Sequence, residues 1–101
     1  MLDRNLYTGL ISLHILHHAA EGPIFGQAMI DELGRHGYRL SAGTLYPILH
    51  GMERHGYLRS RSTLKNGRNR RVYRATPAGR QALVTARERV QELFGEMFER
   101  D

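Results

Sequence analysis

The sequence predicts a mainly α-helical fold with a small β-hairpin. Three observations lead to it: apolar residues recur every three or four positions before Gly56, alternation replaces that spacing after Gly56, and helical spacing returns after Pro77. A chain of 101 residues with 41% apolar content can bury only one modest core. We therefore expect one compact domain over residues 1–76 and a separate helix over residues 77–101.

The first predicted helix covers residues 5–20. An apolar stripe at three- and four-residue spacing, typical of an amphipathic helix, is formed by Leu6, Leu10, Leu13, Leu16 and Ala20. The segment Glu21-Gly22-Pro23 ends this helix, because Gly and Pro interrupt helices and the residue before Pro favours extended backbone.

Two shorter helices are predicted next. Residues 25–35 form the second, with Phe25, Met29 and Leu33 on one face. Ser41 is the N-cap of the third, which runs to about residue 55 and has Gly56 as its C′ residue. The apolar positions that we expect this helix to bury are Leu45, Ile48, Leu49 and Met52.

A two-stranded hairpin is predicted after Gly56. Residues 58–64 and 70–76 alternate and are joined by residues 65–69, which contain Asn66-Gly67. Both of these residues tolerate the positive φ that a tight primed turn requires.

Thr76-Pro77 then begins a fourth helix, since the Thr hydroxyl can cap the first turn and Pro suits the first helical position. Its apolar stripe, which extends too far for one small domain to cover, consists of Leu83, Ala86, Val90, Leu93, Phe94, Met97 and Phe98. This stripe predicts a dimerisation helix that packs on a second copy of the chain.

Charge is segregated along the sequence. The net charge is +5, and no acidic residue lies between Glu53 and Glu88. The cations of that stretch are Arg54, Arg59, Arg61, Lys65, Arg68, Arg70, Arg71, Arg74, Arg80 and Arg87. A solvated surface normally mixes both signs, so this segregation favours a polyanion partner over a merely solvated hairpin.

Several classes of function are disfavoured. The chain has no cysteine, so disulfides, thiolate metal sites and cysteine nucleophiles are excluded. Residues 10–20 are interrupted by histidines and lack the features of a signal peptide or a membrane span, so we expect a cytoplasmic protein with no membrane partner. No nucleophile–base pair, paired carboxylates or phosphate loop occurs, so we expect no enzymatic activity and no required cofactor.

Three helices followed by a basic hairpin form a winged helix-turn-helix, whose third helix enters the DNA major groove and whose hairpin is the wing. The residues expected on the exposed start of the third helix are Ser41, Gly43, Thr44, Pro47 and His50. The expected phosphate contacts of the wing are Lys65, Asn66, Arg68, Arg70 and Arg71. The alternative is structural: Ser41 only caps the helix, Pro47 only shapes it, and the wing cations are solvated.

The segment Leu40-Ser41-Ala42-Gly43-Thr44-Leu45-Tyr46-Pro47-Ile48-Leu49, followed by Glu53 and Gly56-Tyr57-Leu58, resembles the PadR family of transcriptional regulators. So does Tyr73-Arg74-Ala75-Thr76-Pro77-Ala78-Gly79, and the resemblance extends over nearly the whole chain, as in the shorter subfamily with a single C-terminal helix. It implies a repressor. It also implies that Tyr46 faces DNA and that Tyr7 lies near the DNA backbone, although core packing is the alternative for both.

His14 and His18 share one helix face at i, i+4, where two imidazoles can reach one metal ion. If this face met the fourth helix of a partner chain, Glu92 or Glu96 could complete the site. Solvated or hydrogen-bonded histidines are the alternative, and a divalent metal effector is the hypothesis that the pair raises.

The sequence therefore predicts a homodimeric DNA-binding regulator. We expect it to bind a pseudo-palindromic operator in double-stranded DNA and to be released by a small-molecule or metal effector. The competing hypothesis is a winged helix that serves only as a protein-interaction module, which usually lacks a basic wing.

Overall fold

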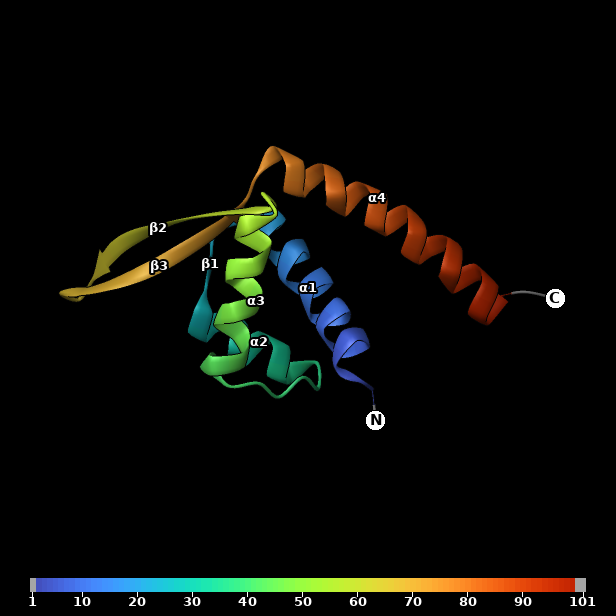
Figure 1. Ribbon diagram of the computed structural model, residues 1–101, viewed down its shortest axis with the longest axis horizontal. Helices are drawn as coiled ribbons and strands as arrows, with labels where there is room; N and C mark the ends of the chain where they lie inside the picture. The colour runs from blue at the N-terminus through green and yellow to red at the C-terminus, as the bar shows by residue number, and fades with distance from the viewer. Residues whose placement is uncertain (1, 100–101) are drawn as a thin grey trace.

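The structure is a computed structural model that describes residues 2–99. Three helices form its centre: α1 (Arg4–Glu21), α2 (Gly26–Arg35) and α3 (Ala42–Arg54). In Figure 1 the β-hairpin leaves this centre on one side and the last helix leaves it on the other, which gives principal extents of 58 × 31 × 20 Å. None of the helices in the described part of the chain has both the length and the apolar character needed to cross a bilayer.

Helix α1 begins where Asp3 caps it, since a carboxylate oxygen of Asp3 accepts from the Leu6 amide at 2.9 Å. The predicted buried face of this helix is partly wrong. Leu16 is buried, but Leu6 is 61% exposed and Leu10 is 41% exposed. The core instead receives Ile11, Ile15 and Ala19, which helical spacing places on the side of the helix opposite to Leu6 and Leu10. More than half of the circumference of α1 is apolar, so only packing decides which face is buried.

The second helix starts one residue later than predicted. Phe25 belongs to a short strand, β1 (Ile24–Phe25), and α2 begins at Gly26. The expected burial of Met29 and Leu33 is confirmed. In α3, Leu45, Leu49 and Met52 are buried as predicted, Ile48 is half-buried, and Gly56 follows the helix with a φ of +84°.

The wing belongs to a sheet of three strands rather than to an isolated hairpin. Strands β2 (Leu58–Lys65) and β3 (Arg68–Ala75) pair antiparallel, and β1 pairs with the other edge of β3. The predicted five-residue connection is wrong, because the strands extend to a two-residue turn at Asn66 and Gly67, whose φ values are 53° and 76°. Those positive φ values are the ones that a primed hairpin turn requires.

The core lies between the three helices and the base of this sheet. Tyr73 of β3 and Leu58 of β2 join Ile24 and the apolar residues of α1, α2 and α3 in one cluster. The base of the wing is therefore held by core packing, whereas the distal halves of β2 and β3 project into solvent (Figure 1).

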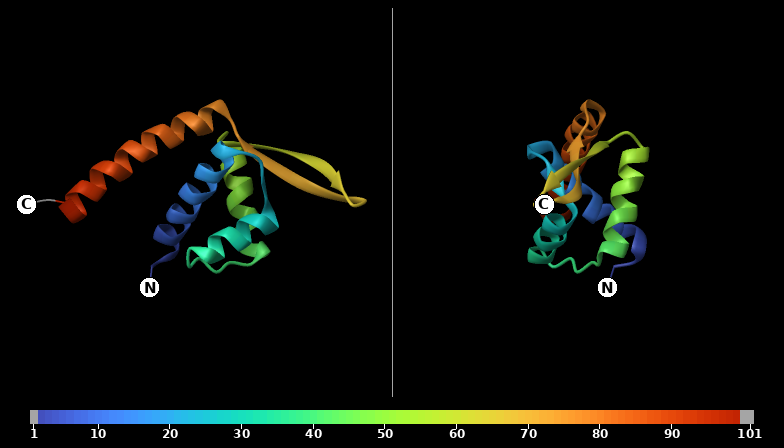
Figure 2. Two further views of the ribbon diagram at one scale, coloured as in Figure 1. Left: turned by 180° about the vertical axis from the view of Figure 1, so that it is seen from behind. Right: turned by 90° about the vertical axis from the view of Figure 1, so that its left-hand side faces the viewer.

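Helix α4 (Pro77–Phe94) begins with the predicted cap and continues as a π-helical turn, η1 (Gly95–Glu99). Thr76 Oγ1 accepts from the Gly79 amide at 2.9 Å and donates to the Gly56 carbonyl at 2.5 Å. Figure 2 shows α4 leaving the centre on the side opposite to the hairpin.

Candidate nucleic-acid interface

The strand register places most of the wing cations on one face. Residues directly opposite each other in an antiparallel pair share a face, and residues two apart along a strand share it as well. In β2 and β3 the pairs Arg59–Arg74, Thr63–Arg70 and Lys65–Arg68 therefore project the same way. This surface, which we call the basic wing face, comprises Arg59, Arg61, Lys65, Arg68, Arg70 and Arg74.

Like charges directly opposite each other weaken a hairpin. The pairs Arg59–Arg74 and Lys65–Arg68 are of this kind. Folding alone does not favour such an arrangement, whereas a polyanion bound to this face stabilises it.

Arg71 occupies the other face of the hairpin and links the wing to α3. Its guanidinium donates to Ser60 Oγ at 3.0 Å, and Ser60 donates from Oγ and from its backbone amide to Glu53 Oε2 at 2.8 and 3.2 Å. Glu53 therefore orients the wing relative to α3. The sequence alone does not reveal this role, although Glu53 is the one carboxylate in the α3 sequence.

The junction between wing, α2 and α3 is an electropositive hollow of about 420 Å³. Its walls include the N-terminal turn of α2, which has no side-chain cap and carries the positive end of the helix dipole. Tyr46 from α3 packs over Gly26, and the Arg70 guanidinium lies 3.6 Å from the centroid of the Phe25 ring. The predicted residues Tyr46, Arg70 and Arg71 are thus brought together around one hollow.

Tyr46 is half-buried and packs against the core, as the core-packing alternative expects. A contact between Tyr46 and DNA stays a prediction. The Tyr46 hydroxyl lies so close to Gly26 that a side chain at position 26 would collide with it.

The start of α3 presents the predicted residues to solvent. Gly43, Thr44, Pro47 and His50 are all exposed. Ser41 occupies the N-cap with extended backbone but makes no side-chain cap bond, and its hydroxyl instead lies 3.4 Å from Thr44 Oγ1. Both hydroxyls are consequently available on the outer surface of this turn.

Tyr7 is not brought to the wing. Its ring packs on Tyr38 with 5.4 Å between the ring centroids. The first turns of α1 lie away from the hairpin tip (Figure 1), and Tyr7 contributes to the partly buried layer around the core.

The basic wing face extends beyond the predicted wing residues. Arg59, Arg61 and Arg74 were recognised only as part of a basic stretch, yet the register aligns them with Arg68 and Arg70. The alternating spacing of Arg59 and Arg61 was the available signal, but without the register it does not show which residues of the returning strand share their face.

A second cavity, of about 670 Å³, lies between α1, α3 and α4. Its apolar lining includes Leu13, Leu16, Ile48, Met52, Ala82 and Ala86. Two of the predicted dimerisation residues, Leu83 and Ala86, are half-buried in this part of α4, and the others, Val90, Leu93, Phe94, Met97 and Phe98, are exposed.

The predicted histidine pair lies on α1 beside the C-terminal end of α2. Burial, followed by repulsion from His36, lowers the pKa of His14 below its usual value. Hydrogen bonds from Arg35 and His36 lower the pKa of the neighbouring Glu32 to about 2. Within this chain, the groups that adjoin His14 and His18 are His36 and Glu32.

A trihelical core whose third helix presents small polar side chains, next to a hairpin with aligned cations, defines a winged helix-turn-helix DNA-binding protein. The particular family follows from comparison. The model of the Transcriptional regulator PadR-like family matches residues 15–85, and the chain belongs to this family of transcriptional regulators.

Individual relatives support the same family. The chain is 51% identical over 94 residues to Transcriptional regulator Rv3488 of Mycobacterium tuberculosis (strain ATCC 25618 / H37Rv), covering 93% of this chain and 88% of that protein. It is similar to the crystal structure of a PadR family transcriptional regulator from Eggerthella lenta DSM 2243, with 28% identity, a TM-score of 0.78, and coverage of 96% and 88%.

The fold also matches Bacillus subtilis PadR, crystallised in complex with operator DNA, at 20% identity and a TM-score of 0.66 over 75% of this chain and 45% of that chain.

Proposed function

We propose that the protein is a homodimeric repressor that binds a pseudo-palindromic operator and is released by an effector. The observation that carries this proposal is the basic wing face, which aligns cations on one side of the hairpin. The start of α3 adds a second exposed surface of small polar side chains. B. subtilis PadR, which has the same fold, was crystallised with operator DNA, and this supports operator binding here.

In the proposed complex, the start of α3 enters the major groove. Ser41 and Thr44 supply hydroxyl groups that can donate to or accept from base edges, and the Thr44 methyl can contact thymine. The basic wing face contacts phosphates of the adjacent backbone, and each such contact releases counterions from the DNA.

The proposed dimer uses two exposed apolar surfaces. One is formed by the distal part of α4 and by η1, where Phe94 is 52% exposed and Phe98 is 67% exposed. The other is the leucine stripe of α1, including Leu6 and Leu10. A two-fold axis lets α4 of one protomer cover these surfaces on the other, because each copy carries the same pair of surfaces.

The cavity between α1, α3 and α4 is the proposed effector site. Its volume of about 670 Å³ is within the range typical of small-molecule pockets. A ligand there contacts both the recognition helix and the dimerisation helix. Titration of the DNA complex with the apolar dye 1-anilinonaphthalene-8-sulfonate tests this site: displacement of DNA supports it, and dye binding without a change in DNA affinity contradicts it.

The main proposal is tested by fluorescence-anisotropy binding to a random DNA pool at several salt concentrations, followed by sequencing of the bound fraction. We expect a palindromic sequence with half-sites about one helical turn, roughly 34 Å, apart. Thr44→Ala should alter the recovered sequence at one position in each half-site.

The matched variants are Arg68→Gln with Arg70→Gln on the wing, and Arg87→Gln with Arg89→Gln on the exposed surface of α4. Both pairs remove the same charge. The wing pair should lower the log–log salt slope by roughly 0.9 for each lost phosphate contact, whereas the α4 pair should leave it unchanged. Equal effects of the two pairs contradict the wing contact, and absence of binding at low salt favours the protein-interaction module.

A further inference from the structure

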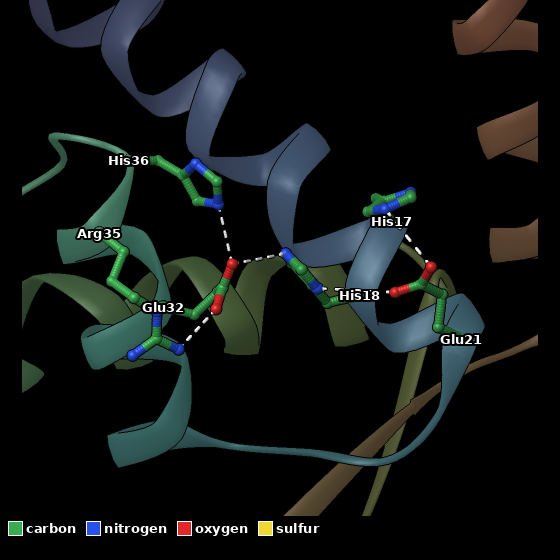
Figure 3. Close-up of polar contacts among 6 residues, drawn as sticks. All are labelled: His17, His18, Glu21, Glu32, Arg35 and His36. Atoms are coloured by element: carbon green, nitrogen blue, oxygen red, sulfur yellow. Dashed lines mark hydrogen bonds and ion pairs between the residues drawn. The ribbon is translucent and has the colours of Figure 1, made fainter.

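A cluster of three imidazoles and one carboxylate joins α1 to the end of α2. His14 and His18 come from α1, Glu32 comes from α2, and His36 is the C-cap residue of α2. One ring nitrogen from each of the three histidines lies within 4.8 Å of the others. Figure 3 shows the Glu32 carboxylate between His18 and His36, with Oε2 at 3.6 Å from His18 Nε2 and 2.8 Å from His36 Nε2.

This cluster contains more histidines than are needed to neutralise the Glu32 carboxylate. Arg35 already neutralises Glu32, donating to Oε1 at 2.6 Å. His18 and His36 lie beside the same carboxylate, and His14 stacks on His36 with 5.2 Å between ring centroids. These three imidazoles repel one another when protonated. A divalent cation instead satisfies several neutral imidazoles and one carboxylate at once.

The geometry allows such a cation with small movements. Metal–nitrogen distances of about 2.0–2.1 Å place tetrahedral ligand nitrogens roughly 3.3 Å apart. The present nitrogens lie within 4.8 Å of one another, so the rings need to rotate inward. His36 is 47% exposed and His18 is 25% exposed at the side chain, which leaves both rings room to turn.

The carboxylate is already oriented for this role. The bond from Arg35 holds Oε1 and leaves Oε2 directed at the imidazoles (Figure 3). Groups outside the ligand set that hold a ligand in this way strengthen metal binding.

We propose that His14, His18, His36 and Glu32 bind one divalent transition-metal ion of the Zn²⁺ or Co²⁺ type. Imidazole nitrogen and carboxylate oxygen suit such borderline ions. The ligands come from two helices, so the ion ties α1 to α2 within one chain.

The position of this site connects it to DNA binding, an inference that rests on the proposed function. His36 ends α2, and Tyr38, which lies edge-on to His14 at 5.1 Å between centroids, is in the segment that leads to α3. Drawing His36 toward α1 therefore moves the turn of the helix-turn-helix motif. We expect the metal to change operator affinity by about 5- to 150-fold, the usual range for coupling between two sites.

Metal binding is tested on the full chain without an affinity tag, by titration with Co²⁺ followed by its visible absorption spectrum and by competition with Zn²⁺. We expect one ion per chain. His36→Gln and Glu32→Gln should each weaken binding by more than about 10-fold, and Arg35→Gln by about 10-fold. Circular dichroism verifies that each variant retains its helices.

His17→Gln is the matched control, because His17 belongs to a second candidate group with His18 and Glu21 on the exposed side of α1. This variant should bind Co²⁺ as the parent does. Loss of binding in His17→Gln with retention in His36→Gln would overturn the proposed site, as would equal binding by all variants.

The effect of the metal on DNA binding is tested separately. Operator affinity is measured with Zn²⁺ and with the chelator EDTA, in the parent and in His36→Gln. A change confined to the parent supports this effect. Metal binding without any change in DNA affinity overturns this effect alone, whereas failure of DNA binding under both conditions concerns the proposed function rather than the metal site.

Discussion

The hairpin and α4 are two arms that leave the same small core in opposite directions (Figure 1), and they differ in the chemistry that they expose. The hairpin aligns cations on one face. The distal half of α4 and the following turn η1 expose Val90, Leu93, Phe94 and Met97, together with Glu88, Glu92 and Glu96. Similar exposure thus serves two purposes: a cationic face suits a polyanion, and an apolar stripe suits a protein surface.

Both arms are attached at one junction. The hairpin begins after Tyr57 and ends before Thr76, and α4 begins directly afterwards. The Thr76 amide donates to the Tyr57 carbonyl at 3.0 Å, and Gly79 packs directly against that carbonyl. A movement of α4 at this junction is therefore transmitted to the base of the wing.

The largest expected effect comes from placing charges in the apolar stripe of α4. Phe94→Glu with Met97→Glu should convert the proposed dimer to a monomer, because a second copy can no longer bury this surface without burying unpaired carboxylates. Operator affinity should fall by about 10²- to 10⁴-fold as the two half-sites lose their linkage. Sedimentation velocity and anisotropy measure the two effects.

The control for that variant is Gln81→Glu with Thr85→Glu, which adds the same charges to exposed positions that helical spacing places opposite the apolar stripe. It should remain dimeric. A dimeric Phe94→Glu/Met97→Glu protein would contradict the assignment of this stripe.

The attachment of α4 is tested by Gly79→Ala. The added methyl group would collide with the Tyr57 backbone carbonyl, which cannot move aside as a flexible side chain could. We expect the free energy of unfolding to fall by about 1–3 kcal/mol, measured by urea denaturation at fixed protein concentration. Gly34→Ala, at a helical position with open space, should instead raise it by about 0.5–1 kcal/mol.

The attachment of the wing is tested by Ser60→Ala, which leaves the net charge unchanged. This variant removes the hydroxyl that connects Glu53 to Arg71, so the free energy of unfolding should fall by about 1 kcal/mol. Operator affinity should fall severalfold, because the wing is less firmly oriented. Ser62→Ala, at an exposed position two residues along the same strand, should change neither quantity measurably.

The smallest effect is expected at the base of the wing, from Tyr73→Phe. Tyr73 is fully buried, its hydroxyl has no hydrogen-bond partner among residues 2–99, and burial raises its pKa. Removing the hydroxyl should leave the free energy of unfolding unchanged or raise it by up to about 1 kcal/mol. Reduced DNA affinity in this variant would show that the wing base takes part in binding as well as in the core.

Much of the fold was predictable from local signals. The Thr76-Pro77 start of α4, the positive φ of Gly56 and the turn at Asn66-Gly67 all occur where the sequence places them. These features depend on the conformational preferences of one or two residues, so they act in the same way in any surrounding structure.

The predictions from the sequence were wrong where packing between distant segments decides the local structure or the buried face. Strand β1 exists because Ile24 and Phe25 pair with β3, more than forty positions later in the chain, and two residues alone carry no strand signal. On α1 two apolar faces compete, and the core uses Ile11 and Ile15 while Leu6 and Leu10 remain exposed.

By itself the sequence determined the order of the elements, the motif at the start of α3 and the strongly basic character of the hairpin. Only the tertiary structure decided that the wing cations share one face, that Glu53 orients the wing, and that His36 and Glu32 join the histidine pair of α1. The physical reason is that helix starts and turns depend on neighbouring residues, whereas a shared face or a cluster of ligands depends on strand register and helix packing between segments that are distant in the sequence.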